Sequence, residues 1–273
     1  MKYFSKIYLV LIFGILYIPI LTLILFSFNS SNSTAVFTGF SLEWYIELFR
    51  TPETFEALRN SLILAVLSAL ISTVIGTAAA EGIYKMRSKL ARAAITSVTN
   101  IPMMNPDIVT GMSMMLFFVA VAGILGISYE NVGFTAMLIS HTTFCLPYVI
   151  LSVLPRINEL GDSLSEAALD LGCTPMQAFF KVKLPNIMPG VLSGAVMAFT
   201  MSLDDFVISY FVGSSNFQTL PLLIYSMTKK KVTPDMYALS TLIIVTVFVL
   251  LVVSNFRSGK KLDAARKKGG AKK

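Results

Sequence analysis

The segment EAALDLGCTPMQAFFKVKLPNIMP, residues 166–189, interrupts a strongly apolar chain with a polar, sharply punctuated pattern. Ser163 and Glu166 stand three residues apart before an Ala/Leu run, which predicts a capping box at the start of a short helix. Gly172 is suited to the left-handed position that ends such a helix. Thr174, followed by a proline, predicts the N-cap of a new helix. We therefore expect a helix, a glycine corner and a second helix.

The second helix of this segment is predicted to be amphipathic. Its apolar residues recur at helical spacing beside the polar residues Gln177, Lys181 and Lys183. The apolar positions are Met176, Phe179, Phe180 and Leu184. Pro185 and Pro189 are expected to end this helix, because a proline inside a helix removes a hydrogen bond. What the segment does then depends on the side of a membrane on which it lies.

Composition indicates that a membrane is the solvent for most of the chain. The 273 residues are 55% hydrophobic and 14% charged, with a mean hydropathy of +0.73, whereas a soluble domain has about 25% charged residues. The excess of 22 Lys and Arg over 15 Asp and Glu is typical of cytoplasmic loops in such a chain, so no nucleic-acid partner is expected. Cys145 and Cys173 have no metal-ligand spacing, which predicts free thiols and no metal site.

Six apolar runs are each long enough to cross a bilayer, which takes about 20 residues. They predict an all-α polytopic membrane protein with six transmembrane helices, in which the first run is an uncleaved span. The runs cover residues 7–28, 61–84, 94–124, 133–154, 187–212 and 236–256. The third run is longer than a bilayer requires, and Pro102 and Pro106 are expected to break it. We expect one domain over residues 1–256 and a basic tail over residues 257–273.

The distribution of basic residues predicts the orientation. Of the 22 Lys and Arg residues, 17 fall in segments on the same side as the N-terminus, and this side is the cytoplasmic one by the positive-inside rule. Both termini and the loop at residues 157–186 are therefore expected in the cytoplasm. The basic tail is expected to lie on anionic lipid.

The predicted outer loop, residues 29–59, contains the single tryptophan, Trp44, next to Tyr45. One interpretation is an aromatic anchor at the membrane interface. The other is a ring at the outer mouth of a pathway, where an aromatic face can stack on a cation. The sequence leaves both open.

Three carboxylates fall inside the predicted spans: Asp107, Asp204 and Asp205. An ionisable residue in a span is costly, so it is a candidate functional group. No Lys or Arg lies at comparable depth in the predicted spans, and uncompensated carboxylates suit a cationic substrate. The alternative is that these aspartates bond to helices of a neighbouring subunit or are protonated.

Two other ionisable residues in the predicted spans have local explanations. Glu81 lies one helical turn before Lys85, which predicts an ion pair near the inner end of the second span. His141 stands alone in the fourth span, and a hydrogen bond between helices is expected there rather than a proton relay. No phosphate-binding loop of the GxxxxGK[ST] kind and no nucleophile–base pair is present, so we expect neither an enzyme nor an ATP-binding chain.

The segment at residues 166–189 resembles part of a known family. The pattern consists of Glu166-Ala167-Ala168, Gly172 after three residues, and an aliphatic residue and Leu184-Pro185 further on. It resembles the signature loop of binding-protein-dependent (MetI-like) ABC importer permeases, and it stands between the fourth and fifth spans as in that family. The chain as a whole is similar to the spermidine/putrescine permeases over about residues 8–256.

This resemblance implies a heteromeric importer of polyamines in the bacterial cytoplasmic membrane. The expected partners are a second homologous permease subunit, a cytoplasmic ATPase dimer that binds ATP and Mg, and an extracytoplasmic polyamine-binding protein. The loop would be the coupling helix that docks on the ATPase. Its contacts would come from Glu166, Ala167, Ala168, Gly172, Met176, Phe179, Phe180, Leu184 and Pro185. Asp107, Asp204, Asp205 and Trp44 would line the substrate pathway.

Other functions remain open at this point. The same machine could carry ferric ion, a phosphonate or an opine, although an anionic substrate would call for basic groups in the pathway. A stand-alone cation-coupled transporter could use the same three aspartates. A membrane receptor or assembly scaffold would need no pathway.

Overall fold

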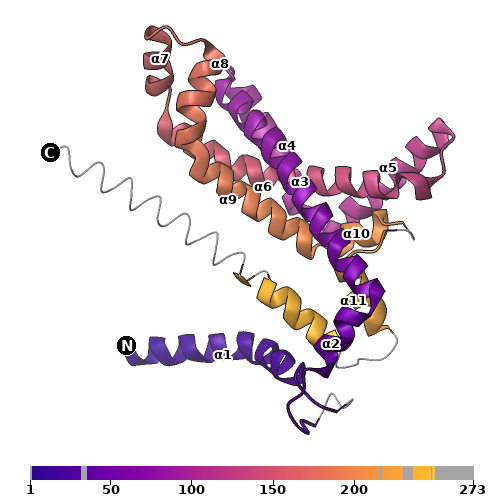
Figure 1. Cartoon of the computed structure of the whole chain (residues 1–273). Coiled ribbons are helices and arrows are strands. Elements are labelled where there is room, and N and C mark those ends of the chain that lie inside the picture. The colour runs from indigo at the N-terminus through magenta and orange to yellow at the C-terminus, as the bar shows by residue number, and fades with distance from the viewer. Residues whose placement is uncertain (1, 32–35, 215–216, 230–235, 247, 250–273) are drawn as a thin grey trace. The chain divides into compact units, whose positions relative to one another are not determined.

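The structure is a computed structural model that describes residues 2–31, 36–214, 217–229, 236–246 and 248–249. Within these ranges the chain is helical, apart from turns and an isolated bridge between Asn29 and Phe40 (Figure 1). The elements, in chain order, are α1 (Lys2–Phe26), α2 (Glu43–Arg50), α3 (Pro52–Lys85), α4 (Lys89–Met104), α5 (Asp107–Leu125), α6 (Tyr129–Leu160), α7 (Ser163–Asp170), α8 (Pro175–Gln177), the π-helix η1 (Ala178–Lys183), α9 (Leu184–Asp204), α10 (Val207–Val212) and α11 (Leu220–Thr228).

Five of the described helices are long and apolar enough to cross a membrane. They are Lys6–Phe26, Pro52–Lys85, Asp107–Leu125, Gly133–Leu160 and Pro175–Asp204. A shorter apolar helix, Met236–Thr246, covers the first part of the predicted sixth span. The rest of that span and the basic tail lie outside the described residues, so the count of six stays a prediction.

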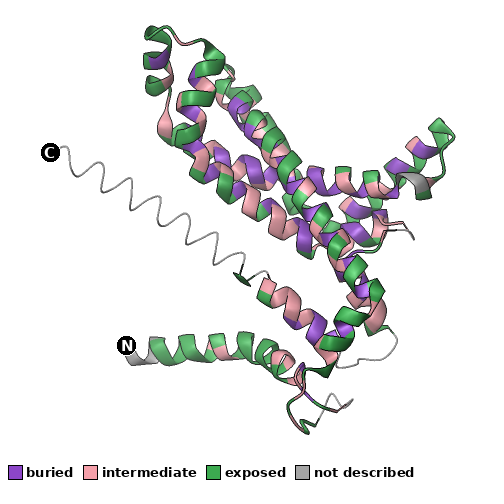
Figure 2. Ribbon diagram, viewed as in Figure 1, coloured by how far each residue is buried: buried purple, intermediate pink, exposed green. Residues whose placement is uncertain are grey.

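The chain divides into two compact units. Among the described residues, the first comprises those up to Leu58 and those from Leu220 onward, and the second comprises those from Arg59 to Thr219. In the first unit, α1 exposes most of its apolar side chains (Figure 2). A small core joins Leu48, Ala57, Leu220, Leu223 and Leu239.

The second unit is built on the close packing of α6 against α9, which lie side by side (Figure 1). Every fourth residue of α9 on the contact face is small and buried, namely Gly190, Gly194, Ala198 and Ser202. A Cβ atom on Gly190 would lie 2.9 Å from the carbonyl oxygen of Ser152, and one on Gly194 would lie 3.1 Å from the Cα of Val149. Such spacing of small residues lets two membrane helices approach closely without clashes.

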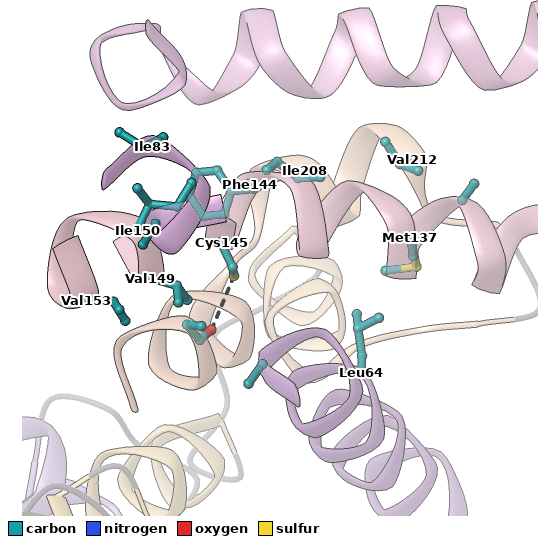
Figure 3. Close-up of a cluster of buried hydrophobic side chains, with 14 of the residues drawn as sticks. Leu64, Ile83, Met137, Phe144, Cys145, Val149, Ile150, Val153, Ile208 and Val212 are labelled. Carbon is teal, nitrogen blue, oxygen red and sulfur yellow. Dashed lines mark hydrogen bonds between the residues drawn. The ribbon is translucent and has the colours of Figure 1, made fainter. Parts of the chain in front are cut away.

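Helix α10 packs on α5 and α6 and completes this unit. A Cβ on Gly111 of α5 would lie 3.1 Å from the ring of Phe211, so a larger residue here would require that ring to shift slightly. Figure 3 shows the buried apolar cluster, to which α3, α6 and α10 contribute Leu64, Met137 and Ile208, among others. The Cys145 thiol donates to the carbonyl oxygen of Ala198, 3.3 Å away, and ties α6 to α9.

Three prolines behave differently from the prediction. The third run does break, but it breaks at Asn105 and Pro106, between α4 and α5, and Pro102 lies inside α4. Pro185 and Pro189 do not end a helix, because α8, η1 and α9 follow each other without a gap. At the entry to α9, the amide of Leu184 bonds to the carbonyl of Phe179, five residues back. This wide turn directly precedes Pro185, which has no amide hydrogen to donate, so the helix accommodates the proline without ending.

The fifth predicted span, residues 187–212, is not continuous. Helix α9 ends at Asp204, the backbone is extended at Asp205 (φ −66°, ψ 122°), and α10 begins at Val207. The prediction missed this break because the sequence around it is apolar on both sides and contains no proline or glycine. The break places the adjacent aspartates at the junction between two helices.

Candidate functional site

The corner segment, residues 163–183, comprises α7, α8 and η1. Asp162, and not Ser163, takes the N-cap position of α7, with no side-chain capping bond. The predicted capping box between Ser163 and Glu166 is therefore wrong, because the helix begins one residue earlier than its pattern suggests. The amide of Glu166 donates to the backbone oxygen of Asp162 at 2.9 Å, and its side chain is exposed.

The glycine corner and the second helix start are confirmed. Gly172 has φ +86°, and the amide of Cys173 donates to the carbonyl of Ala168 at 3.0 Å, which closes the end of α7. The hydroxyl of Thr174 accepts from the amide of Gln177 at 3.3 Å. In return, the side-chain oxygen of Gln177 accepts from the amide of Thr174 at 3.1 Å. This reciprocal capping box fixes the start of the second helix; the sequence analysis had foreseen its threonine arm only.

The corner segment exposes large apolar side chains (Figure 2). Leu171 is 86% exposed, Met176 68% and Phe180 55%. Phe179 is half-buried and packs edge-on against Phe180, with ring centroids 5.2 Å apart. Apolar groups clustered on an otherwise polar loop mark a contact surface. The amphipathic pattern predicted the methionine and the phenylalanines as contact residues, whereas Leu171 stands out only once its exposure is known.

The remaining predicted contact residues divide by exposure. Ala167 and Pro185 are exposed, while Leu184 is half-buried. Ala168 is buried within this chain, so it closes the corner and is not available for close approach of a partner.

A buried ion pair, which the sequence analysis missed, joins the end of the corner segment to α3. The Lys183 side chain lies 3.0 Å from Oε1 and 2.8 Å from Oε2 of Glu81, and its Nζ stands 4.4 Å over the ring of Tyr84. Lys183 is 2% exposed. The predicted pair between Glu81 and Lys85 is confirmed at 3.0 Å. The sequence placed Lys183 on the polar side of the second helix and gave no sign of its burial.

The three candidate pathway aspartates, Asp107, Asp204 and Asp205, all stand at helix ends in the second unit. Asp107 is the first residue of α5, Asp204 is the last of α9, and Asp205 lies between α9 and α10. Among the described residues, no Lys or Arg forms an ion pair with any of the three. Their part in a substrate pathway stays a prediction.

The adjacent aspartates have different environments. Asp204 is exposed, whereas the Asp205 side chain is only 6% exposed. The Asp205 carboxylate accepts from the amides of Ile208 at 3.3 Å and Ser209 at 2.9 Å. It also lies 3.5 Å from Nε2 of His141. Asp205 thus caps α10 and has little carboxylate surface left for a solute.

His141 is the centre of a buried polar network that the sequence did not reveal. Its Nδ1 is 2.8 Å from the Ser202 hydroxyl, and its Nε2 is 3.1 Å from the Ser209 hydroxyl. The Ser68 hydroxyl donates to Ser202 at 2.8 Å. The network joins α3, α6, α9 and α10, and the expected interhelical hydrogen bond of the histidine is confirmed. The three serines are too common in sequence to have indicated this arrangement.

Tyr129, which precedes the apolar part of α6, makes a similar link outside the candidate span. Its hydroxyl donates to the carbonyl oxygen of Val212 at 2.7 Å. Burial raises the pKa of the Tyr129 hydroxyl above its usual range, so the group stays a neutral donor. This bond holds the end of α10 against the start of α6.

Trp44 lies in α2 and belongs to the first unit, whereas the three aspartates belong to the second. Its indole Nε1 donates to the carbonyl oxygen of Asn29 at 2.6 Å, and the side chain is half-buried. The side chain of Asn29 in turn bonds to Val36 and Thr38. The indole therefore organises the loop around Asn29, and its predicted part in a pathway stays a prediction.

The family follows from comparison with known proteins. Residues 72–258 match the model of the family described as "Binding-protein-dependent transport system inner membrane component". This match covers more than half of the chain, and the chain belongs to this family. It is a multi-pass membrane protein and a permease subunit, not a catalytic one.

Relatives and solved structures agree with this assignment. The chain is 39% identical to the putrescine transport system permease protein PotI of Escherichia coli K12, over 86% of this chain and 84% of the relative. It is 39% identical to the spermidine/putrescine transport system permease protein PotC of the same strain, over 89% of each chain. A bacterial ABC transporter involved in alginate import has the same fold, with a TM-score of 0.77 at 17% identity over 95% of both chains. The MetNI methionine ABC transporter aligns with a TM-score of 0.61 at 21% identity, over 77% of this chain and 97% of that chain.

Proposed function

We propose that this chain is the permease subunit of an ATP-driven importer that carries spermidine, putrescine or both across the bacterial cytoplasmic membrane. The observation that carries the proposal is the 39% identity, over most of both chains, to two permeases named for these polyamines. Both termini face the cytoplasm in this proposal, and residues 1–256 act as one six-span permease domain with a basic tail on anionic lipid.

The charges of the second unit support a cationic substrate. Asp107 and Asp204 are exposed carboxylates, and in the described part of the chain neither pairs with a lysine or arginine. Such groups attract a polyamine and repel an anion. In this proposal they line the pathway, Asp205 keeps the junction between α9 and α10 in shape, and Trp44 lies at the outer mouth.

The corner segment supports a cytoplasmic protein partner. Its exposed apolar residues, Leu171, Met176 and Phe180, would enter a groove of an ATPase subunit, as helices with apolar anchors commonly do. A dimer of that ATPase binds ATP and Mg, and this chain binds neither. A second homologous permease completes the pathway, and an extracytoplasmic polyamine-binding protein delivers the substrate.

Uptake in cells tests the proposed function. The chain is deleted from cells that retain the other subunits, and uptake of radiolabelled spermidine and putrescine is compared with and without the restored gene. The proposal predicts that energised uptake of at least one polyamine depends on the chain. Uptake of ferric ion, a phosphonate or an opine that depends on the chain, with both polyamines unaffected, would contradict it.

A further inference from the structure

The buried ion pair between Glu81 and Lys183 lies where the corner segment meets the helix bundle. Lys183 is the last residue of η1, and Glu81 lies near the inner end of α3, 102 positions earlier in the sequence. The carboxylate meets the ammonium group with both oxygens, at 3.0 and 2.8 Å. The ion pair therefore joins the end of η1 to α3, two elements that are far apart in the sequence.

The backbone connections on both sides of α7 are more flexible than this ion pair. The helix is flanked by Gly161 (φ +66°) and Gly172 (φ +86°), and glycine adopts many backbone conformations at low cost. Helix α7 packs on η1, and η1 continues directly into α9. A displacement of α7 is thus passed to η1 through packing.

The surroundings of Lys183 restrict its position further. Its Nζ stands 4.4 Å over the ring of Tyr84, and the guanidinium group of Arg92 lies 5.8 Å from the same ring. The Arg92 side chain also donates to the backbone oxygens of Tyr84 and Met86. The end of α3, the start of α4 and the end of η1 therefore form one charged joint. A cation over an aromatic face adds to the attraction when both are desolvated.

A buried ion pair is weak evidence for stability, because the cost of desolvating two charges offsets their attraction. Its strongest effect is to fix which groups lie together, since an unpaired buried charge is costly. The six residues of η1 are in the π conformation, which is rare and often found at functional positions. We propose that the Glu81–Lys183 pair is a positioning joint that makes the corner segment and the inner end of α3 move together when the partner ATPase acts.

This inference rests on the proposed function for its partner, so its test uses a readout that needs no transported substrate. The complete transporter is purified, and amide hydrogen exchange is followed on addition of ATP and Mg to a complex with a hydrolysis-deficient ATPase. In the unmodified chain, exchange is expected to change both in the corner segment and around Glu81. In the double variant Glu81→Leu/Lys183→Met, the change is expected to stay within the corner segment.

The double variant distinguishes a role of the ion pair in coupling from a role in folding. Removing both charges leaves no buried charge unpaired, because Lys85, the other partner of Glu81, is exposed to solvent. The complex is therefore expected to assemble with normal abundance. The amount of substrate moved per ATP hydrolysed is expected to fall by about fivefold or more, the lower end of ordinary coupling between sites. Lys183→Arg keeps the charge and is expected to retain more coupling than Lys183→Met.

Lys85→Met is the matched control, because it removes a cation from the same carboxylate without touching η1. In Lys85→Met, hydrogen exchange is expected to change both in the corner segment and around Glu81, as in the unmodified chain. The amount of substrate moved per ATP hydrolysed is also expected to stay the same. The inference is overturned if the double variant couples normally, or if it fails to assemble, since the pair would then serve folding. Failure of the unmodified transporter to move either polyamine would sink the proposed function and leave the exchange test of the joint intact.

Discussion

At the scale of single residues, Asp204 and Asp205 are neighbours in the sequence but lie in different environments. Asp204 is exposed at the end of α9, and Asp205 is buried against His141 and two backbone amides. Adjacency in sequence suggested one acidic pair. The helix break between them gives one carboxylate to solvent and the other to the start of α10.

This difference predicts that Asp204→Asn and Asp205→Asn have different effects. Asp204→Asn is expected to lower polyamine uptake at near-normal abundance, because it removes an exposed negative charge. Asp205→Asn is expected to lower the thermal stability of the chain, because a buried amide left without a partner costs about 1–3 kcal/mol. Uptake per amount of protein and the unfolding temperature in detergent measure the two effects. Glu130→Gln, an exposed carboxylate at the start of α6, is the control.

Equal loss of uptake in both variants, at equal stability, would contradict this division. Asp205 would then contact substrate directly, in spite of its backbone bonds. Loss of uptake in Glu130→Gln as well would indicate a general effect of negative charge.

The His141 network predicts a stability effect. His141→Ala removes a hydrogen-bond partner from Ser202 and from Ser209, and each lost hydrogen bond costs about 0.5–1.5 kcal/mol. It also removes the imidazole that lies against the buried Asp205 carboxylate. The unfolding temperature in detergent is expected to fall markedly. Thr143→Ala is the matched control, because Thr143 bonds only within its own helix turn, to the carbonyl of Ile139. An unfolding temperature that falls no further for His141→Ala than for the control would show that the network contributes little.

At the scale of elements, the contact between α6 and α9 depends on a row of small residues. Gly194→Leu is expected to lower the abundance of folded protein, because its Cβ would press on the backbone of Val149 at 3.1 Å. Overpacking of this kind costs about 1–3 kcal/mol or more. Ser193→Leu, on the exposed side of the same helix, is the control and is expected to fold normally. Equal folding of both variants, measured by size-exclusion chromatography in detergent, would argue against this packing.

The corner segment predicts loss of a partner without loss of fold. Leu171→Ser and Phe180→Ser are expected to reduce co-purification of the ATPase on the order of tenfold each, since apolar anchors at an interface commonly contribute more than 1 kcal/mol. The matched control is Leu90→Ser, which changes a leucine of α4 that is also highly exposed. If the ATPase co-purifies normally with both corner variants, these residues do not form its docking surface.

Local signals in the sequence predicted the corner well and its surroundings less well. Gly172 and Thr174 were identified correctly because a left-handed glycine and a threonine N-cap are set by neighbours in sequence. The start of α7 was misplaced by one residue, and Pro185 was taken as a helix end. The joint at Lys183 escaped notice because it depends on Glu81, which is distant in sequence. Pairings between segments far apart cannot be seen from the periodicity of either one.

At the scale of the whole molecule, the apolar runs predicted an all-helical membrane protein, and the family assignment confirmed it. The second predicted span, residues 61–84, lies within the longer helix α3, which begins at Pro52. The run at residues 94–124 is broken into two helices, α4 and α5, as its prolines predicted, but the fifth run is broken where no proline or glycine stands. Hydropathy locates apolar stretches but does not register a backbone break between two of them. The sequence placed all three aspartates inside predicted spans, whereas in the structure they stand at helix ends, and their part in a substrate pathway stays a prediction.

The most direct test of the account is transport by purified components. The complete transporter, with both permeases, the ATPase dimer and the loaded binding protein, is reconstituted in lipid vesicles and compared with this chain alone. The account predicts that radiolabelled spermidine or putrescine accumulates only in the complete system and only with ATP, and that Asp107→Asn and Asp204→Asn slow it at normal assembly. Accumulation driven by this chain alone, without ATP, would contradict the account.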